Sequence, residues 1–143
     1  MQQYRIIIVD GHPLFRNALK RTLQLSLNNS TLIEADNMAE LTKVLDSNPN
    51  VDLILLDLSI QGVHGYSGLL DIRGKHPEIR VAVISAIDNY ETIHRCMNFG
   101  AVGFLSKTLK MEIIQNAVND ILNGNIWVPP IYDLDHFEGG QHY

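Results

Sequence analysis

Short apolar runs alternate with amphipathic segments along the chain. Most of the runs are rich in β-branched residues and place apolar side chains at consecutive positions, which is typical of strands buried on both faces. Between them, apolar residues recur at spacings of three and four, which predicts helices with one buried face. The predicted strands lie at 6–9, 31–35, 51–58, 80–85 and 102–105.

A helix is expected after each of these strands. The second helix begins near Asn37 with Glu40 three residues later, a pattern that resembles a capping box. Asn89 is expected to cap the fourth helix, and Gly100 and Gly124 are expected to end the fourth and fifth, because glycine readily closes a helix. The apolar positions that mark the five helical faces include Leu19 and Leu23, Leu41 and Leu45, Leu69 and Ile72, Ile93 and Met97, and Ile114 and Ile121.

This alternation predicts an α/β domain. Apolar strands that alternate with helices form a parallel sheet covered on both faces. Right-handed crossover connections leave chiefly doubly wound topologies, in which the ligand lies beyond the carboxyl ends of the strands. The polar residues that follow strands are therefore the first candidates for a functional site.

Composition narrows the classes of protein that fit this pattern. The 143 residues are 45% hydrophobic and 19% charged, which suits one globular domain, and a net charge of −5 argues against an extended nucleic-acid surface. Cys96 is the single cysteine, so an internal disulfide and a four-cysteine zinc site are excluded and a structural role is expected. No apolar run approaches the roughly 18 residues of a membrane span, and the first residues lack a signal-peptide core. A cytoplasmic protein without membrane contact is expected.

Four polar residues stand where apolar runs end. Asp10, Asp57, Ser85 and Lys107 lie at or just after the ends of the first, third, fourth and fifth predicted strands. Carboxylates bind a hard cation through oxygen, while an ammonium and a hydroxyl neutralise and hydrogen-bond phosphoryl oxygens. Together these side chains predict a magnesium-assisted phosphoryl site at one edge of the sheet.

Four segments, in this order and spacing, resemble those of a known family. They are VDGHPLFRNAL at 9–19, LILLDLSIQGVHG at 53–65, VISA at 83–86 and GAVGFLSK at 100–107. Over about 4–124 the chain resembles the receiver domain of two-component response regulators of the NarL/LuxR type. The resemblance implies a doubly wound, flavodoxin-like fold with five parallel strands in the order 2-1-3-4-5.

The resemblance implies a role for each matching residue. Asp57 matches the aspartate that accepts a phosphoryl group from a partner sensor histidine kinase. Ser85 matches the switch hydroxyl that follows the phosphoryl group, and Lys107 matches the lysine that pairs with it. Phe104 matches the aromatic residue whose rotamer changes on phosphorylation. A signalling domain, with only self-catalysed phosphotransfer and slow dephosphorylation, is therefore expected rather than an enzyme.

The same resemblance implies a Mg²⁺ site and reveals departures from the family. Asp10, Asp57 and the backbone carbonyl of Ser59 match the metal-binding positions. Gly11 stands where the family has a second acidic residue, and 61–62 reads Gln-Gly where Pro-Gly is common. Two interpretations of Gly11 stay open. Either water fills the vacant magnesium position and binding is weakened, or efficient phosphorylation has been given up.

Several of these residues also have ordinary structural interpretations. Ser85 can bond to backbone at a strand end, Asp10 can stabilise a turn, and Phe104 can be a plain core residue. The six histidines share no helical spacing, so no zinc site is expected, and His12 is expected to pack or hydrogen-bond near its loop. A solvated helix face is expected for the basic residues Arg16, Lys20 and Arg21.

A phosphorylation-switched receiver is the function that the sequence favours. An atypical receiver, which binds partners without being phosphorylated, is the alternative that Gly11 supports. A haloacid-dehalogenase-type phosphatase needs an acid two residues after its aspartate, where this chain has Ser59. A flavodoxin is disfavoured because the loop after the first strand lacks a hydroxyl-rich phosphate cradle.

The chain is expected to divide at residue 124. Residues 1–124 are expected to form the receiver domain, and 125–143 an exit linker to a helix-turn-helix module that these residues do not contain. The expected output is transcription regulation, with DNA as a partner only through that module. Formation of a homodimer is left open.

Overall fold

The computed structural model describes residues 3–60 and 65–133. The sequence departure at 61–62 and the end of the expected linker, 134–143, lie outside the described residues. In this part of the chain, five strands form one parallel sheet in the order β2-β1-β3-β4-β5, which confirms the expected fold. The strands are β1 (Arg5–Val9), β2 (Thr31–Ala35), β3 (Leu53–Asp57), β4 (Arg80–Ser85) and β5 (Gly103–Ser106).

Strand boundaries fall within two residues of the predicted ones. β5 begins and ends one residue later than the apolar run indicated. β3 begins two residues later than predicted, although the N–H of Asp52 already donates to the carbonyl of Arg5 (2.8 Å). Asp52 Oδ2 accepts a hydrogen bond from the N–H of Arg5, at the start of β1 (2.8 Å).

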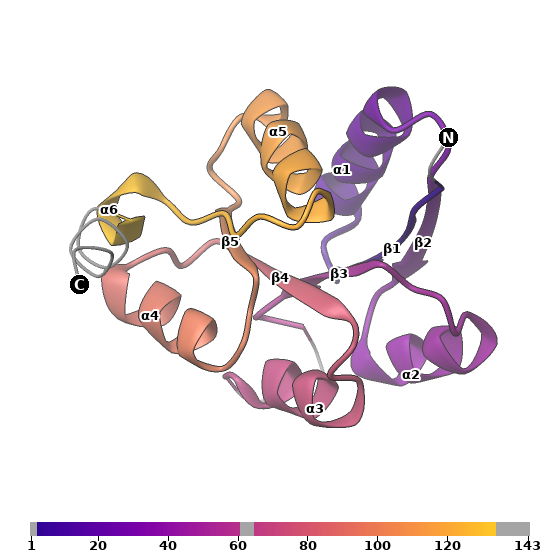
Figure 1. The fold of residues 1–143 in the computed structure, drawn as a ribbon, viewed down its shortest axis with the longest axis horizontal. Helices are drawn as coiled ribbons and strands as arrows, with labels where there is room; N and C mark the ends of the chain where they lie inside the picture. Colours follow the sequence, from indigo (N-terminus) through magenta and orange to yellow (C-terminus); the bar gives the residue numbers. More distant parts are fainter. Residues whose placement is uncertain (1–2, 61–64, 134–143) are drawn as a thin grey trace.

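Helices cover both faces of the sheet, as Figure 1 shows. α1 (Pro13–Ser26) and α5 (Met111–Leu122) lie on one face. α2 (Met38–Ser47), α3 (Ser67–Lys75) and α4 (Tyr90–Asn98) lie on the other. In the described ranges, no helix combines the length and the apolar character needed to span a membrane.

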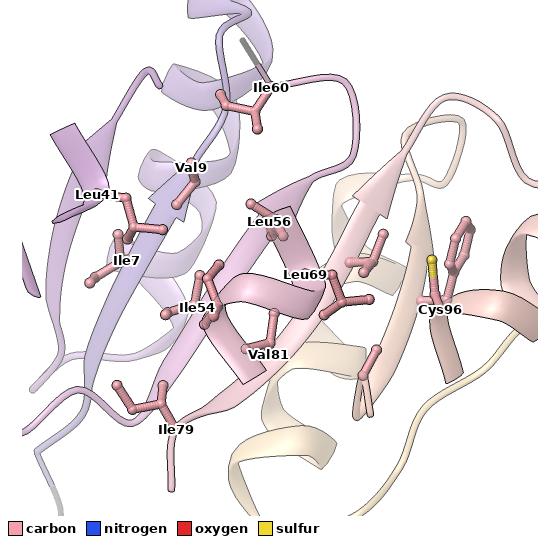
Figure 2. Packing of buried hydrophobic residues seen from close by; sticks show 14 of the residues in the cluster. Ile7, Val9, Leu41, Ile54, Leu56, Ile60, Leu69, Ile79, Val81 and Cys96 are labelled. Atoms are coloured by element: carbon pink, nitrogen blue, oxygen red, sulfur yellow. The ribbon is translucent and has the colours of Figure 1, made fainter. Parts of the chain in front are cut away.

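Alternate residues of each strand point to opposite faces, so the sheet separates two apolar cores. Ile6 and Ile8 of β1 pack with α1 and α5, whereas Ile7 and Val9 belong to the core under α2, α3 and α4. Cys96 of α4 is buried in this latter core, where desolvation raises the pKa of its thiol to about 12. Figure 2 shows this core with Ile7, Val9, Leu41, Ile54, Leu56, Ile60, Leu69, Ile79, Val81 and Cys96 labelled.

The start of α2 carries the expected cap in a modified form. Asn37 Oδ1 accepts from the N–H of Glu40 (2.8 Å), as a capping box requires. The return bond differs, because the Glu40 carboxylate accepts from the N–H of Asp36 (2.6 Å) and not from that of Asn37. The cap therefore satisfies backbone donors on both sides of the helix start.

The sequence signals at the start of α4 and at the ends of α4 and α5 act as predicted. Asn89 Oδ1 accepts from the N–H of Thr92 at the start of α4 (2.9 Å). Gly100 and Gly124 follow the ends of α4 and α5 with φ angles of 99° and 96°. This left-handed conformation favours glycine, which explains why both helices end there.

The segment 125–133, which we call the C-terminal strap, folds back onto the sheet. The N–H of Trp127 donates to the carbonyl of Val102 (3.2 Å), and the N–H of Phe104 donates to the carbonyl of Trp127 (3.1 Å). A Cβ on Gly103 would lie 2.7 Å from Ile121 Cδ1 and 3.3 Å from the Trp127 carbonyl oxygen. Glycine at this position therefore permits the strap to approach the edge of β5.

The strap ends in a short helix, α6 (Pro130–Asp133), that packs on α4. Tyr132 is only 5% exposed, and its ring centroid lies 5.6 Å from that of Tyr90 and 5.9 Å from that of His94. The packed structure thus continues past residue 124, where the sequence suggested that a linker begins.

Replacing Tyr132 with alanine should test this packing. Tyr132→Ala removes a buried ring, and we expect the free energy of unfolding to fall by about 1.5–3 kcal/mol. Ile131→Ala is the matched control, because Ile131 neighbours Tyr132 and is 57% exposed. Urea denaturation of the two variants provides the measurement. If Tyr132→Ala and Ile131→Ala had equal free energies of unfolding, the packing of Tyr132 in the strap would contribute nothing to the fold.

Candidate functional site

Three polar residues from separate strands meet at the carboxyl edge of the sheet. Asp10 follows β1, Asp57 ends β3, and Lys107 follows β5. The Lys107 Nζ atom lies 2.9 Å from Asp10 Oδ2 and 3.0 Å from Asp57 Oδ2. Both carboxylates are almost fully buried, with 1% of Asp10 and 2% of Asp57 exposed. The sequence predicted that these three side chains converge, and the structure brings them together.

Asp57 is held in its charged form. Burial by itself would raise its pKa, because it penalises the carboxylate. The N–H of Ser59 (3.0 Å) and the Lys107 ammonium outweigh burial and hold the pKa of Asp57 below its ordinary value. The hydroxyl of Ser59 donates to the same carboxylate, 3.0 Å from Oδ1 and 3.1 Å from Oδ2. Sequence reasoning assigned only the carbonyl of Ser59, so this hydroxyl contact was missed.

Asp10 presents a buried oxygen to the same site. Its Oδ1 accepts from the N–H of His12 (2.7 Å), which makes a tight turn after β1. Its Oδ2 is ion-paired with Lys107, but no hydrogen bond from the described residues reaches it. A buried carboxylate oxygen that lacks a hydrogen bond suits a cation, and the two aspartates supply the oxygen ligands that Mg²⁺ prefers.

His12 completes what we call the rim cluster, namely Asp10, His12, Asp57 and Lys107. The His12 Nδ1 atom lies 3.0 Å from Asp10 Oδ1, 3.3 Å from Asp57 Oδ2 and 2.9 Å from Lys107 Nζ. The side chain of His12 is 63% exposed. The expectation that His12 hydrogen-bonds near its loop is confirmed. Its approach to both carboxylates was not foreseen, and the turn pattern Asp10-Gly11-His12 is the signal that points to it.

Ser85 is the last residue of β4, and Phe104 lies within β5. Ser85 Oγ accepts from the N–H of Ile87 (3.0 Å), and the Ser85 carbonyl accepts from the N–H of Lys107 (2.9 Å). Phe104 is fully buried in the core under α4. The contact of the Ser85 hydroxyl is the backbone bond of the ordinary interpretation, and the switch roles of both residues stay predictions.

Gly11 is exposed beside the rim cluster, and its backbone does not require glycine. Its φ is not positive, unlike that of Gly65, Gly100 and Gly124. A Cβ at Gly11 would lie 3.5 Å from the carbonyl oxygen of Asp36 and at ordinary van der Waals distance from other atoms. The position would therefore accept a Cβ atom without backbone strain.

The basic face of α1 is not simply solvated, which corrects the expectation for two of its residues. Arg16 Nε and Lys20 Nζ each lie 3.0 Å from the carboxylate of Glu34 on β2. The hydrogen bond from Lys20, with help from Arg16, outweighs burial and lowers the pKa of Glu34. Arg16 also donates to the backbone carbonyl of Asp10, so it fixes the loop that carries the rim cluster. Arg21 is exposed as expected.

Known proteins share both this fold and large parts of the sequence. A family model described as the response regulator receiver domain matches residues 6–119. The glycerol metabolism activator of Pseudomonas putida is 35% identical over 127 residues, which cover 89% of this chain and 58% of the activator. The chain spans about half the length of the curated relatives it matches.

Solved structures agree with this match. The signal receiver domain of the putative response regulator NarL from Mycobacterium tuberculosis is 31% identical, with a TM-score of 0.77, and the match covers 87% of this chain and all of that one (100%). A LuxR family DNA-binding response regulator from Silicibacter pomeroyi is 30% identical, with a TM-score of 0.80, covering 90% of this chain and 99% of that one.

The sheet order and the two aspartates and one lysine at its carboxyl edge agree with the family match, which identifies a receiver domain of signalling response regulators. The chain belongs to the response regulator receiver domain family, of the NarL/LuxR type.

Removing the Lys107 ammonium should lower the free energy of unfolding at neutral pH and have a smaller effect at acid pH. Lys107→Met leaves the buried Asp57 carboxylate without its ammonium, and we expect a loss of about 1.5–3 kcal/mol at pH 7. Because Asp57 has a lowered pKa in the folded state, the stabilisation is fully present above the unfolded pKa of about 3.9. It is lost as the pH falls further, so the gap between variant and wild type should narrow below about pH 4.

Urea denaturation from about pH 3 to pH 7 in the presence of EDTA measures this gap, because EDTA keeps a divalent cation from replacing the ammonium. Lys43→Met is the control, since Lys43 is an exposed lysine on α2. A gap that stays constant over this pH range would contradict the assigned pairing of Lys107 with Asp57.

Proposed function

We propose that Asp57 accepts a phosphoryl group from the phosphohistidine of a partner sensor histidine kinase, as part of a two-component system. One observation carries this proposal: Asp57 is a buried, charged carboxylate with an ammonium 3.0 Å away at the ligand-binding edge of the sheet. The comparisons support a receiver, and the residue assignment rests on the position of Asp57 in that site.

The transfer needs a nucleophile and a neutralising partner. A carboxylate oxygen of Asp57 attacks the phosphorus atom, and the P–N bond to the donor imidazole breaks. The imidazole leaves with the bonding electron pair and takes up a proton. The Lys107 ammonium pairs with the phosphoryl oxygens as they approach, because it already lies against the carboxylate that they join.

Asp10 and Asp57, with the backbone carbonyl of Ser59, would hold the Mg²⁺ ion that the family uses. When bound, the ion neutralises charge on the phosphoryl oxygens. Gly11 offers no side chain to this ion, so in this proposal binding is weakened and water occupies the free position.

Phosphorylation would then act on the strands that flank the site. In this proposal the Ser85 hydroxyl leaves the N–H of Ile87 to bond a phosphoryl oxygen, and Phe104 changes rotamer. Phe104 is joined to the strap through the bond between its N–H and the carbonyl of Trp127. The face formed by α4, β5 and α5 would carry the output.

The proposed output of the whole protein is transcription regulation. Residues 1–124 serve as the receiver and 125–143 lead towards a helix-turn-helix module, which alone would contact DNA. The relative from Silicibacter pomeroyi is described as a DNA-binding response regulator, and the relative from Pseudomonas putida as an activator. Dimer formation on phosphorylation is part of the same proposal.

An atypical receiver, which binds partners without being phosphorylated, is the second candidate. Gly11 favours it, since the missing acid removes one metal ligand from the site. The buried Asp10 and Asp57 with the adjacent Lys107 favour phosphorylation, because two buried carboxylates are unfavourable unless cationic partners compensate them, as they do in a cation-assisted phosphoryl site.

Phosphorylation of Asp57 can be tested by labelling with acetyl phosphate. We expect intact-mass spectrometry to detect one phosphoryl group on the wild type in the presence of Mg²⁺. Asp57→Asn should not be labelled, because an amide is not a nucleophile here, whereas the exposed Asp46→Asn should be labelled normally. Equal labelling of wild type and Asp57→Asn, or none of either, would favour the atypical receiver.

Restoring the second acid should strengthen Mg²⁺ binding. Gly11→Asp adds a carboxylate where the backbone tolerates one, and we expect the dissociation constant for Mg²⁺ to fall by about tenfold. Gly11→Asn is the matched control, since it has the same shape without the charge. Isothermal titration calorimetry measures both. An affinity that is unchanged or lower in Gly11→Asp would show that the glycine is not a vacant ligand position.

A further inference from the structure

Three atoms with lone pairs face one another in the rim cluster. The His12 Nδ1 atom lies 3.0 Å from Asp10 Oδ1 and 3.3 Å from Asp57 Oδ2. Oxygen and nitrogen atoms from these three residues all lie within 4.8 Å of one another, which is the spacing of a metal-binding group. The third residue of this group is an imidazole, which stands two positions after Asp10 and directly after Gly11.

His12 Nδ1 cannot form favourable hydrogen bonds with Asp10, Asp57 and Lys107 at the same time. Lys107 is a donor only, so Nδ1 must offer its lone pair to the ammonium at 2.9 Å. That lone pair then faces the carboxylate oxygen of Asp10 at 3.0 Å, which is an acceptor only. If Nδ1 carries a proton instead, the contact with Lys107 becomes unfavourable. A cation bound by the three atoms would satisfy them together.

The spacing of these atoms matches a metal site. Two ligands in adjacent positions of an octahedral ion, each about 2.1 Å from it, lie about 3.0 Å apart. The two distances from His12 Nδ1 to the carboxylates are close to this value. The cluster also carries a net negative charge when His12 is neutral, because it contains two carboxylates and only one ammonium.

The backbone that carries the imidazole is held in place before any ion binds. The N–H of His12 donates to Asp10 Oδ1, and Pro13 begins α1 directly afterwards, so the backbone at His12 is constrained on both sides. Arg16 fixes the carbonyl of Asp10 from the same helix. A preformed ligand loses little conformational entropy on binding.

We propose that His12 is a nitrogen ligand at this site for a transition cation, and that it then fills the position that water takes around Mg²⁺ in the absence of an acid at Gly11. Asp10, Asp57 and His12 then form a site for a first-row transition cation, such as Mn²⁺, in preference to Mg²⁺. Imidazole suits the later cations of this row best, and Mn²⁺ accepts a nitrogen ligand more readily than Mg²⁺, which favours oxygen ligands alone. This inference rests on the proposed function, because it concerns the cation that would assist phosphorylation of Asp57.

The preference for Mn²⁺ over Mg²⁺ tests the inference. Isothermal titration calorimetry of the wild type should give an Mn²⁺ affinity at least about tenfold above that for Mg²⁺. His12→Ala should lower the Mn²⁺ affinity by about tenfold or more and leave the Mg²⁺ affinity nearly unchanged. His76→Ala, which changes a histidine at the end of α3, is the matched control and should retain the preference. An equal Mn²⁺ to Mg²⁺ ratio in wild type and His12→Ala would overturn the inference.

A direct spectroscopic readout is independent of activity. Pulsed electron paramagnetic resonance of bound Mn²⁺ should reveal coupling to a ¹⁴N nucleus in the wild type and in His76→Ala, but not in His12→Ala. Absence of nitrogen coupling in the wild type would overturn the inference.

Labelling of the wild type by acetyl phosphate separates this inference from the proposed function. Labelling that depends on Asp57 and Mg²⁺, without nitrogen coupling to Mn²⁺, would overturn only the role of His12. A chain that binds neither cation and shows no labelling of Asp57 would overturn both.

Discussion

The site depends on one electrostatic constraint: two buried carboxylates must stay charged within a few ångströms of each other. The parallel register sets this distance, because Val9 of β1 pairs with Leu56 of β3 and the next residues are Asp10 and Asp57. Burial of either charge alone would be strongly unfavourable. Lys107 resolves the conflict from β5, on the far side of β4, by contacting both carboxylates. The fold therefore supplies the charge balance as well as the position.

This balance is incomplete, and the incompleteness explains how the site can bind ligands. One ammonium cannot neutralise two carboxylates, so the rim cluster keeps a negative charge whenever His12 is neutral. Asp10 Oδ2 adds a buried oxygen that receives no hydrogen bond from the described residues. Such a site attracts a cation, and a bound cation can in turn attract a phosphoryl group. Residues that look poorly satisfied in isolation are thus suited to the chemistry of a receiver.

Much of this arrangement could be predicted from the sequence, because it follows from strand ends. Consecutive apolar residues locate β1, β3 and β5, and the parallel sheet then brings Asp10, Asp57 and Lys107 to one edge. Contacts that depend on the exact direction of a side chain could not be predicted. The ring of His12 points at both carboxylates because of a local turn. The strap could not be predicted either, since the burial of Tyr132 depends on α4, far away in the sequence.

β5 connects the strap, which could not be predicted, with the predicted cluster of Asp10, Asp57 and Lys107. Its Phe104 N–H bonds to the strap, and three residues later Lys107 contacts Asp57. In the proposed function, phosphorylation replaces a carboxylate by a bulkier dianionic group, so Lys107 must adjust to new oxygens. The backbone of β5 is bonded to β4 on one side and to Trp127 on the other, so a backbone shift at Lys107 would be passed to both neighbours. The strap is therefore linked to the charge at Asp57 through β5 and Lys107.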